Sequence, residues 1–244
     1  MPWYKDWFGE EYLEMYSHRG ESEAEEHADF VERHLGGSGR PRPRAVLDLA
    51  CGAGRHTAAL RRRGYRTLGL DLSLTLLVQM RARGLPRVAG DMRLLPFSAE
   101  SFDWVLNFFT SFGYFASERE NFRVLEEIVR ILAPGGCFLI DLMNPGLAVA
   151  DLKPRDEQEL DGRRAEIERW YDAESHRINK RIVVSAPGEP ARTFLESVRI
   201  YQPEEVTIGL RWAGLEVASL FGNFQGDPYE RDSERLILIG FKPA

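Results

Sequence analysis

The sequence lacks most of the features that mark secreted and membrane proteins. Of its 244 residues only Cys51 and Cys137 are cysteine, and they lie far apart in apolar settings. No apolar run approaches the roughly 18 residues that a membrane-spanning helix needs. The first 27 residues also lack a basic region followed by an apolar stretch, so we predict no signal peptide. These absences argue against a disulfide framework and predict a cytoplasmic protein without a membrane partner.

Positive charge is also scarce. The chain has 32 Lys and Arg against 38 Asp and Glu, a formal net charge of −6. Binding of nucleic acid over a broad surface needs a net positive charge, although the composition leaves room for a local basic patch. With 43% apolar and 29% charged residues, the chain has the composition of an ordinary globular protein. Its length fits one large α/β domain, alone or with a modest insertion, and the composition favours a small-molecule partner.

Residues 44–145 alternate apolar strands with amphipathic helices, which predicts βαβ units and a parallel sheet buried on both faces. The predicted strands are Ala45–Leu49, Thr67–Leu70, Arg87–Ala89, Phe102–Phe108 and Cys137–Leu142. The predicted helices between them are Arg55–Arg63, Leu74–Arg83 and Glu118–Leu132. The segment LAPGG stops the last helix, because proline cannot continue it and glycine accepts a left-handed cap.

The flanking segments differ from this core. Residues 1–43 predict a helical cap that ends in a Gly/Pro/Arg linker. Residues 146–201 predict an insertion that is helical or irregular over 146–160 and then forms three antiparallel strands, Arg164–Asp172, Arg177–Ser185 and Thr193–Tyr201. Residues 202–244 return to the core as a helix, Pro203–Ala213, and two strands, Leu215–Leu220 and Arg235–Phe241. The insertion could cover a substrate or form a homodimer interface, and the sequence does not choose.

The sharpest motif is VLDLACGAGRHT, residues 46–57. A strand ends at Asp48–Leu49, a glycine-rich turn follows, and a helix begins near Arg55. Gly52 and Gly54 remove side chains where a ligand must approach the backbone, and they tolerate positive φ. The helix start offers free N–H groups to a carboxylate or phosphate. This arrangement predicts a nucleotide-type ligand across the carboxyl end of the strand.

Two details separate this loop from a dinucleotide-binding one. Position 57 is Thr where the dinucleotide pattern has its third glycine, and Asp48 lies inside the strand just before the turn. A carboxylate there would repel pyrophosphate but could bind a cationic amino group. S-adenosylmethionine (SAM) carries an ammonium beside its carboxylate, which favours SAM over NAD. The alternative, an NAD(P)-dependent oxidoreductase, would also need a proton donor such as a Tyr-x-x-x-Lys pair, and none is evident.

Further polar residues end the next strands. Asp71 lies 23 residues beyond Asp48, close to the spacing at which an acid receives ribose hydroxyls. Asp91 can accept from an adenine amine with Met92 against the ring, and Asn107 precedes a strongly aromatic loop. Each acid alone could merely cap a helix or face water. Three acids at successive strand ends behind a glycine turn are less easily explained that way.

These segments resemble class I SAM-dependent methyltransferases. VLDLACGAGRHT, GLDLS, GDMRLLPF and FDWVLNFF are similar to the family's first four motifs, and RILAPGGCFLIDLMN to the helix–turn–strand element after them. The resemblance covers roughly residues 44–144, and the nearest subgroup is small bacterial methyltransferases with CGxGRH and SFGYF. It implies a Rossmann-like α/β fold whose seven-stranded sheet has an antiparallel last strand, helices on both faces, and a small antiparallel β insertion. It does not fix a substrate.

The resemblance also assigns residues to parts of the cofactor. It places Asp48, Gly52 and Gly54 at the methionine portion, Asp71 at the ribose, Asp91 with Met92 at the adenine, and Asn107 beside the transferable methyl. Further candidates for cofactor binding are Ala50, Arg55, His56, Leu72, Tyr16 and Arg19. Candidates for the acceptor pocket are Phe109, Phe112, Tyr114 and Tyr229, although aromatic side chains also pack in cores.

Departures from related patterns narrow the activity. An Asp/Asn-Pro-Pro motif is absent after the fourth strand and no Pro-Cys pair occurs, which argues against DNA amino- and cytosine-methylating enzymes. Cys51 is expected to be a small apolar residue of the turn. Methyl transfer from a sulfonium is an in-line displacement that alignment can accelerate strongly, so we assign no catalytic residue and expect no metal. RNA methylation and a SAM-fold binding protein without transfer activity remain alternatives.

Overall fold

The computed structural model describes residues 2–17, 20–36 and 42–244. Its larger sheet has seven strands in the order β10-β11-β5-β4-β1-β2-β3. They are β1 (Val46–Leu49), β2 (Thr67–Asp71), β3 (Arg87–Ala89), β4 (Phe102–Asn107), β5 (Leu132–Met143), β10 (Glu216–Phe221) and β11 (Arg235–Phe241). Strands β1 to β5 pair in parallel, whereas β11 runs antiparallel to both β5 and β10. The predicted Rossmann-like fold with an antiparallel last strand is confirmed.

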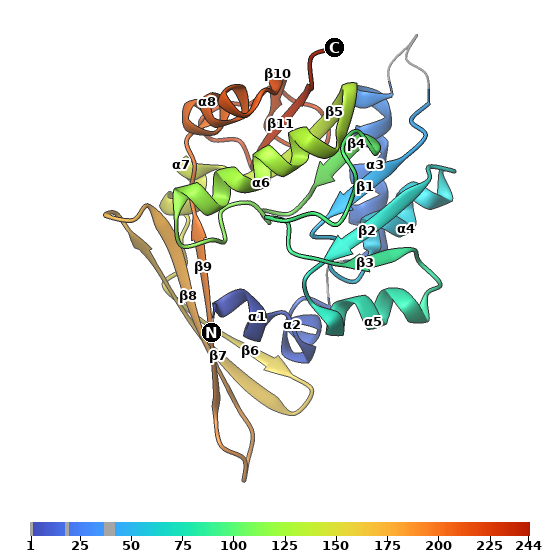
Figure 1. Ribbon diagram of the computed structural model, residues 1–244. Helices are drawn as coiled ribbons and strands as arrows, with labels where there is room; N and C mark the ends of the chain where they lie inside the picture. Colours follow the sequence, from blue (N-terminus) through green and yellow to red (C-terminus); the bar gives the residue numbers. More distant parts are fainter. Residues whose placement is uncertain (1, 18–19, 37–41) are drawn as a thin grey trace.

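Helices cover both faces of this sheet, as its apolar central strands require. Helices α3 (Glu21–Leu35) and α4 (Arg55–Arg62) share one buried cluster with the sheet. Helices α6 (Glu118–Ile131) and α8 (Pro203–Ala213) share the other, and α5 (Leu74–Ala82) lies beside β2 and β3 (Figure 1). No helix in the described parts of the chain is both long and apolar enough to cross a bilayer.

The insertion is a separate antiparallel sheet with one strand more than predicted. Its strands follow sequence order: β6 (Arg155–Leu160), β7 (Arg163–Asp172), β8 (Arg177–Ser185) and β9 (Arg192–Arg199). The expectation of a helical or irregular segment over 146–160 is correct for α7 (Pro145–Ala150) but wrong for β6. The sequence RDEQEL buries only Leu160, so it carries no apolar alternation. Backbone pairing to β7 makes it a strand, and its charges suit an edge position.

The boundary between α6 and β5 also differs slightly from the expectation. Helix α6 ends at Ile131, as the LAPGG stop predicts, but β5 begins at once with Leu132 rather than at Cys137. Leu132 pairs with Phe102, and the register then shifts so that Cys137 pairs with Trp104. The turn residues are therefore an irregularity inside the strand.

Two short helices at the start of the chain lie between the two sheets (Figure 1). We call α1 (Trp3–Trp7) and α2 (Glu10–Met15) the lid helices. Trp7 is fully buried against Phe194 of β9, in a cluster that the insertion and the lid helices form together. The lid helices therefore pack on the insertion while facing the parallel core.

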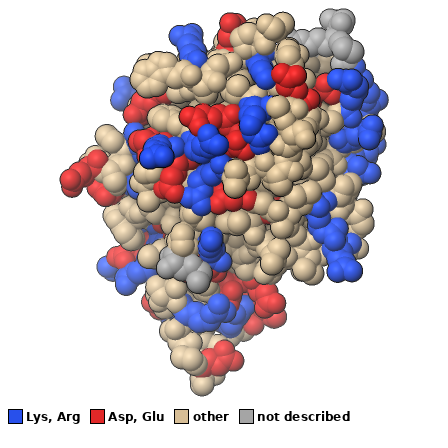
Figure 2. Space-filling model, viewed as in Figure 1, with Lys and Arg blue, Asp and Glu red and all other residues tan. Residues whose placement is uncertain are grey.

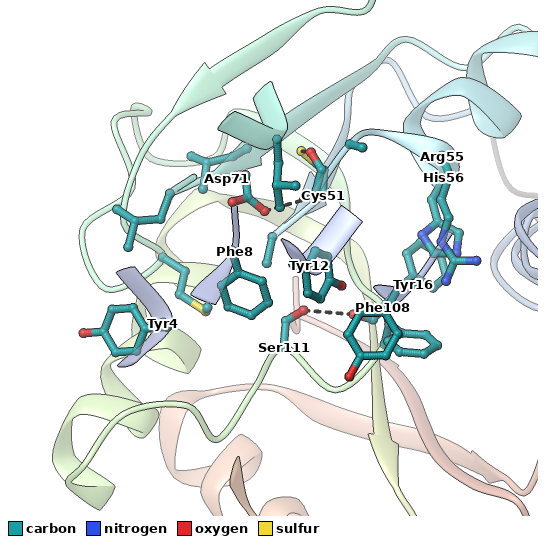
Figure 3. A pocket seen from close by; sticks show the side chains of 18 of the residues that line it. Tyr4, Phe8, Tyr12, Tyr16, Cys51, Arg55, His56, Asp71, Phe108 and Ser111 are labelled. Carbon is teal, nitrogen blue, oxygen red and sulfur yellow. Dashed lines mark hydrogen bonds between the residues drawn. The ribbon is translucent and has the colours of Figure 1, made fainter. Parts of the chain in front are cut away.

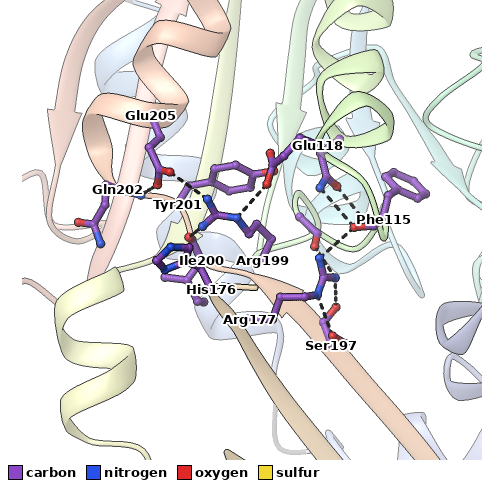
Figure 4. Close-up of polar contacts among 12 residues, drawn as sticks. Phe115, Glu118, His176, Arg177, Ser197, Arg199, Ile200, Tyr201, Gln202 and Glu205 are labelled. Carbon is purple, nitrogen blue, oxygen red and sulfur yellow. Dashed lines mark hydrogen bonds and ion pairs between the residues drawn. The ribbon is translucent and has the colours of Figure 1, made fainter. Parts of the chain in front are cut away.

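Arginines of the insertion attach it to the core (Figure 4). The Arg177 guanidinium on β8 donates to the Phe115 carbonyl at 3.0 Å. Arg199, which ends β9, donates to Glu118 at 2.8 Å and to Glu205 at 2.9 Å, at the starts of α6 and α8. The insertion is thus fixed by charge-assisted hydrogen bonds to the loop and helices that follow β4.

Candidate active site

A cavity of about 320 Å³ lies at the carboxyl ends of β1, β2, β3 and β4, beneath the lid helices. We call it the strand-end cavity. Figure 3 shows Phe8 and Tyr12 of the lid beside Asp71 and Cys51, with His56 at one end. The residues predicted for cofactor binding that line it are Ala50, Gly52, Arg55, His56, Asp71, Leu72, Asp91, Met92 and Tyr16. Arg19, also predicted, lies outside the described residues.

The turn after β1 has the backbone that the motif requires. Ala50, Gly52 and Gly54 have φ of 59°, 57° and 80°. Gly54 does not line the cavity; a Cβ there would lie 2.7 Å from Met80, so packing on α5 requires its glycine. Cys51 is buried against Met80, and burial raises the pKa of its thiol well above the usual value. A protonated, buried thiol fits the predicted packing role.

Asp71 joins the turn to the end of β2. One carboxylate oxygen accepts from the Gly52 amide at 2.8 Å, and the other accepts from the Ser73 amide at 2.8 Å. Burial raises its pKa, and these amide hydrogen bonds oppose the shift. The residue is 9% exposed and lines the cavity. A fixed acceptor of this kind can receive hydroxyl groups of a ligand.

Asp48 differs from the expectation that it touches the ligand. It is 1% exposed and does not line the cavity, because its carboxylate accepts from the Thr57 hydroxyl at 2.6 Å. Desolvation raises its pKa to about 6, against the hydrogen bonds from Thr57. Its position inside β1 lets it connect that strand to α4 beneath the turn. Asp48 therefore supports the turn from below.

Asp91 lines the cavity but is already paired. Arg93 donates to its carboxylate from Nη2 at 2.6 Å and from Nε at 3.1 Å. Burial disfavours the charge, but the hydrogen bonds from Arg93 outweigh it and lower the pKa of Asp91. Met92 lines the same wall. The arginine two residues on was not among the predicted site residues.

A pair of buried histidines closes one end of the strand-end cavity. His56 of α4 lines it, stacks on Phe108 at 4.1 Å, and lies 2.9 Å from His27 of α3 between ring nitrogens. Desolvation lowers the pKa of His27 to about 3 and that of His56 well below its usual value. Both rings are therefore neutral at pH 7. His27 was missed, although it follows Ala24 by three residues on the buried stripe of α3.

The guanidinium of Arg55 is engaged by protein. It forms an ion pair with Glu23 of α3, and it lies 5.3 Å from the centre of the Phe109 ring. Its predicted contact with a ligand carboxylate would have to share or replace the Glu23 contact. Gly54 caps α4 without a side-chain hydrogen bond, so no side chain of the capping residue occupies the first backbone N–H groups of the helix, although the Thr57 amide is engaged by Asp48.

Three residues predicted for the site do not line the strand-end cavity. The Asn107 amide donates to the Leu49 carbonyl at 2.9 Å and ties β4 to β1. Phe112 is 2% exposed and packs against Tyr201 in the core, 5.1 Å between ring centres. Tyr229 donates to Asn144 at 3.2 Å. None of the three lines a cavity described here. Each of the three therefore makes a contact within the fold: Asn107 and Phe112 are buried, and Tyr229 is partly buried.

A second cavity, of about 680 Å³, lies between the lid helices, the insertion sheet, α7 and the ends of β5 and β11. We call it the insertion cavity. It shares five aromatic residues with the strand-end cavity, and these form what we call the aromatic partition: Phe8, Tyr12, Tyr16, Phe109 and Tyr114. Phe109 and Tyr114, predicted for an acceptor pocket, are therefore reached from both sides. Phe8 was not among the predicted site residues, because the lid helices are distant in sequence from the strand ends that they pack against in the fold.

A buried cation supports the partition on the insertion side. Lys180 of β8 is 7% exposed, donates to the Tyr16 hydroxyl, and lies 3.5 Å from Glu196 of β9. The Tyr16 hydroxyl donates to Glu196 at 3.3 Å. Charged side chains of both signs thus meet at the wall of an otherwise largely apolar cavity.

Known proteins match this chain in both sequence and fold. A family model described as a methyltransferase domain matches residues 46–136. A cypemycin N-terminal methyltransferase from a Streptomyces species is 28% identical over 203 residues, 80% of this chain and 82% of that protein. A dTDP-3-amino-3,4,6-trideoxy-alpha-D-glucopyranose N,N-dimethyltransferase from Streptomyces venezuelae is 28% identical over 224 residues, 87% and 91% of the two chains.

A solved structure shares the architecture. It is an S-adenosylmethionine-dependent methyltransferase from Clostridium acetobutylicum, with a TM-score of 0.78 at 18% identity over 91% of this chain and 92% of that one. At this identity the match shows a common fold. With a methyltransferase domain matched over residues 46–136, relatives that are methyltransferases over most of the chain, and the Rossmann-like sheet with its antiparallel last strand, the chain has the class I methyltransferase fold and is a methyltransferase.

Proposed function

We propose that the protein binds SAM in the strand-end cavity and transfers its methyl group to an amine of a small molecule or short peptide in the insertion cavity. The observation that carries this proposal is the aromatic partition, which both cavities share. A methyl donor on one side and an acceptor on the other would meet there. The cytoplasm is the expected compartment, from the low cysteine content.

The residues of the strand-end cavity fit SAM. Asp71 offers carboxylate oxygens to the ribose hydroxyls, and its amide hydrogen bonds hold it in place. The free N–H groups at the start of α4 suit the carboxylate of the methionine portion. Met92 and Leu72 offer the adenine apolar contacts, and the Asp91 carboxylate, held by Arg93, offers it a polar one. A cavity of about 320 Å³ is at the lower end of the range for such ligands.

SAM, when bound, supplies a methyl group on a positively charged sulfur. The chain's own contribution is orientation and the exclusion of water. Rings of Phe8, Tyr12 and Phe109 suit a cationic centre, because aromatic faces attract cations. Alignment alone can supply a large part of the acceleration in such a displacement. We therefore assign no general base.

The names of the two relatives support an amine as acceptor, since one is an N-terminal methyltransferase and the other an N,N-dimethyltransferase. The insertion cavity is the larger of the two cavities and faces charges of both signs, including Glu196 and Lys180. A carboxylate at that wall can bind the acceptor amine in its ammonium form, before the ammonium loses a proton. The same placement favours a substrate-covering role for the insertion, and homodimerisation stays a prediction.

The surface gives no particular support to an RNA substrate. Figure 2 shows Lys and Arg mixed with Asp and Glu across the viewed face, with more basic side chains along its right edge. At the end of α4, Arg62 and the following Arg63 pair with Glu25 of α3. Such pairing leaves less charge for phosphate contacts.

Calorimetry with SAM and with S-adenosylhomocysteine (SAH) tests cofactor binding, and we expect both to bind. Mass spectrometry then follows methylation of two acceptor sets, amino sugars linked to nucleotides and peptides with a free N-terminus, with N-acetylated peptides as the matched control. Absence of binding to both SAM and SAH would refute the proposal. Binding without methylation of any amine would favour the alternative of a SAM-fold binding protein.

A further inference from the structure

The backbone is strained at Phe109, a residue of the aromatic partition, and at the residue after it. Phe109 and Thr110, which follow β4 after one intervening residue, have φ of +61° and +57°. Residues with a Cβ rarely adopt this left-handed region, and two in succession require the surroundings to hold them. Both residues line the insertion cavity, and Phe109 lines the strand-end cavity as well.

Asp141 and Arg235, which we call the clamp, hold this turn from the neighbouring strands. The Asp141 carboxylate on β5 accepts from the Phe109 amide at 2.7 Å, and its carbonyl accepts from the Thr110 amide at 2.9 Å. Arg235 of β11 donates to the Asp141 carboxylate at 2.8 Å. Its second nitrogen donates to the Thr110 hydroxyl at 3.0 Å. Three of these hydrogen bonds therefore end on Phe109 or Thr110, and the fourth joins the two clamp residues.

The side chain of Phe109 is held as closely as its backbone. The guanidinium of Arg55 lies 5.3 Å from the ring centre and that of Arg235 lies 5.5 Å from it. Cation–π contacts of this kind attract a guanidinium to the ring and so favour one placement of the side chain. The ring therefore contacts one arginine that lines the strand-end cavity and another that lines the insertion cavity.

The clamp is costly for the fold. Asp141 is 0% exposed, and a buried carboxylate is unfavourable unless it is paired and hydrogen-bonded. Burial raises its pKa, and Arg235 opposes the shift. A pair of apolar residues would join β5 to β11 with less desolvation. Asp141 and Arg235 instead hydrogen-bond to the strained turn, which indicates that the ion pair serves to hold that turn.

We propose that Asp141 and Arg235 are positioning residues for methyl transfer: they hold the strained Phe109–Thr110 turn so that the Phe109 ring lies in the wall shared by the two cavities, beside the line along which the methyl group passes from donor to acceptor. The inference rests on the proposed function, because it assigns donor and acceptor to the two sides. Asp141 lines neither cavity, and Arg235 lines only the insertion cavity. They act through Phe109.

Amide hydrogen exchange of the protein without ligands tests the clamp directly. In Asp141→Asn and Arg235→Gln, exchange at residues 109 and 110 should rise by about tenfold or more, with the rest of β5 and β11 little changed. The affinity for SAH should change by less than about threefold. With an amine acceptor from the activity screen, kcat should fall by roughly tenfold to a hundredfold while KM changes little.

A matched control and a rescue separate positioning from general stability. Asp103→Asn is the control, because Asp103 also accepts backbone amides, from Arg44 and Ala45, away from both cavities. It should leave exchange at residue 109 unchanged. Adding Thr110→Asn to Arg235→Gln should restore protection, since asparagine tolerates the left-handed region.

Unchanged exchange at residues 109 and 110 in both clamp variants would overturn the inference. So would a rise spread evenly over β5 and β11 that Thr110→Asn does not reverse. Failure of the proposed function is a different result: the wild-type protein would not bind SAH, whereas the exchange experiment needs no ligand.

Discussion

The two cavities are built in different ways. The strand-end cavity takes its polar wall from residues close to one another along the chain, the turn after β1 and the end of β2, joined by the 2.8 Å hydrogen bond between Gly52 and Asp71. The insertion cavity is assembled from the lid, β5, α7, the insertion and β11, and its supports are charged pairs such as Lys180 with Glu196. Under the proposed function, the residues that recognise the donor are thus largely close in sequence, whereas recognition of the acceptor depends on how distant segments pack together.

The largest expected effect breaks the strand-end cavity alone. Asp71→Ala removes the acceptor for ribose and the tie to Gly52, so SAM affinity should fall about a hundredfold by calorimetry. Asp48→Asn, which keeps an acceptor for Thr57 away from the cavity, should change affinity far less. If Asp71→Ala binds SAM as tightly as the wild-type protein, the assignment of this cavity is wrong.

The next effect is a loss of stability at low pH, which arises from the buried histidine pair at the end of the same cavity. The pKa of His27 is about 3 in the folded protein, mainly through desolvation with Arg55 and Arg235 adding to it, against 6.5 ordinarily. Between these values the unfolded chain binds the proton and the folded chain does not, so stability from this source is complete above pH 6.5 and is lost on acidification. At pH 5 the loss is about 2 kcal/mol, and His56 shifts in the same direction.

Urea unfolding at pH 7.5 and pH 5 measures this loss, and His27→Gln should reduce it. An equal loss in His27→Gln and the wild-type protein would show that the histidine pair is not its source.

A smaller effect addresses the insertion cavity. Arg177→Gln removes the hydrogen bonds to the carbonyls of Gly113 and Phe115, so the acceptor KM should rise by roughly tenfold at nearly constant SAM affinity. Arg181→Gln, on the same strand but paired with exposed Glu168, should alter neither. Equal changes in KM and SAM affinity would contradict the separation of the two cavities.

The smallest effect sharpens the comparison at the partition itself. Thr110→Asn should relieve left-handed strain and raise the free energy of unfolding by up to about 1 kcal/mol. Thermal unfolding measures this change, with Thr193→Asn at an exposed position of β9 as control. A loss of stability in Thr110→Asn would mean that its hydroxyl contact with Arg235 outweighs the strain.

Sequence reasoning succeeded where structure is encoded locally. The βαβ order, the glycine turn and the position of Asp71 follow from apolar periodicity and spacing, and the structure has all three. The strand ends of a parallel sheet meet at one edge, so residues that follow each strand converge there. This geometry placed Asp91 and His56 at one cavity from sequence alone.

Partners distant along the chain escaped prediction. Asn107 was expected beside the ligand, but its amide meets the Leu49 carbonyl, a contact that only the pairing of β4 with β1 creates. Phe8 joins the partition because the lid folds back over strand ends that follow it by forty or more residues. The apolar periodicity of one segment carries no information about its tertiary contacts with distant segments.

The lid helices have one more consequence, which concerns the order of events. Phe8 and Tyr12 belong to the walls of both cavities, and the Ser73 hydroxyl holds the lid down by donating to the Phe8 carbonyl at 2.6 Å. Under the proposed function, a movement of the lid helices that releases the spent donor would also open the insertion cavity, because the same residues line both. We expect a singly methylated product to escape before the second donor arrives, so double methylation would proceed by separate encounters with free intermediate accumulating in solution.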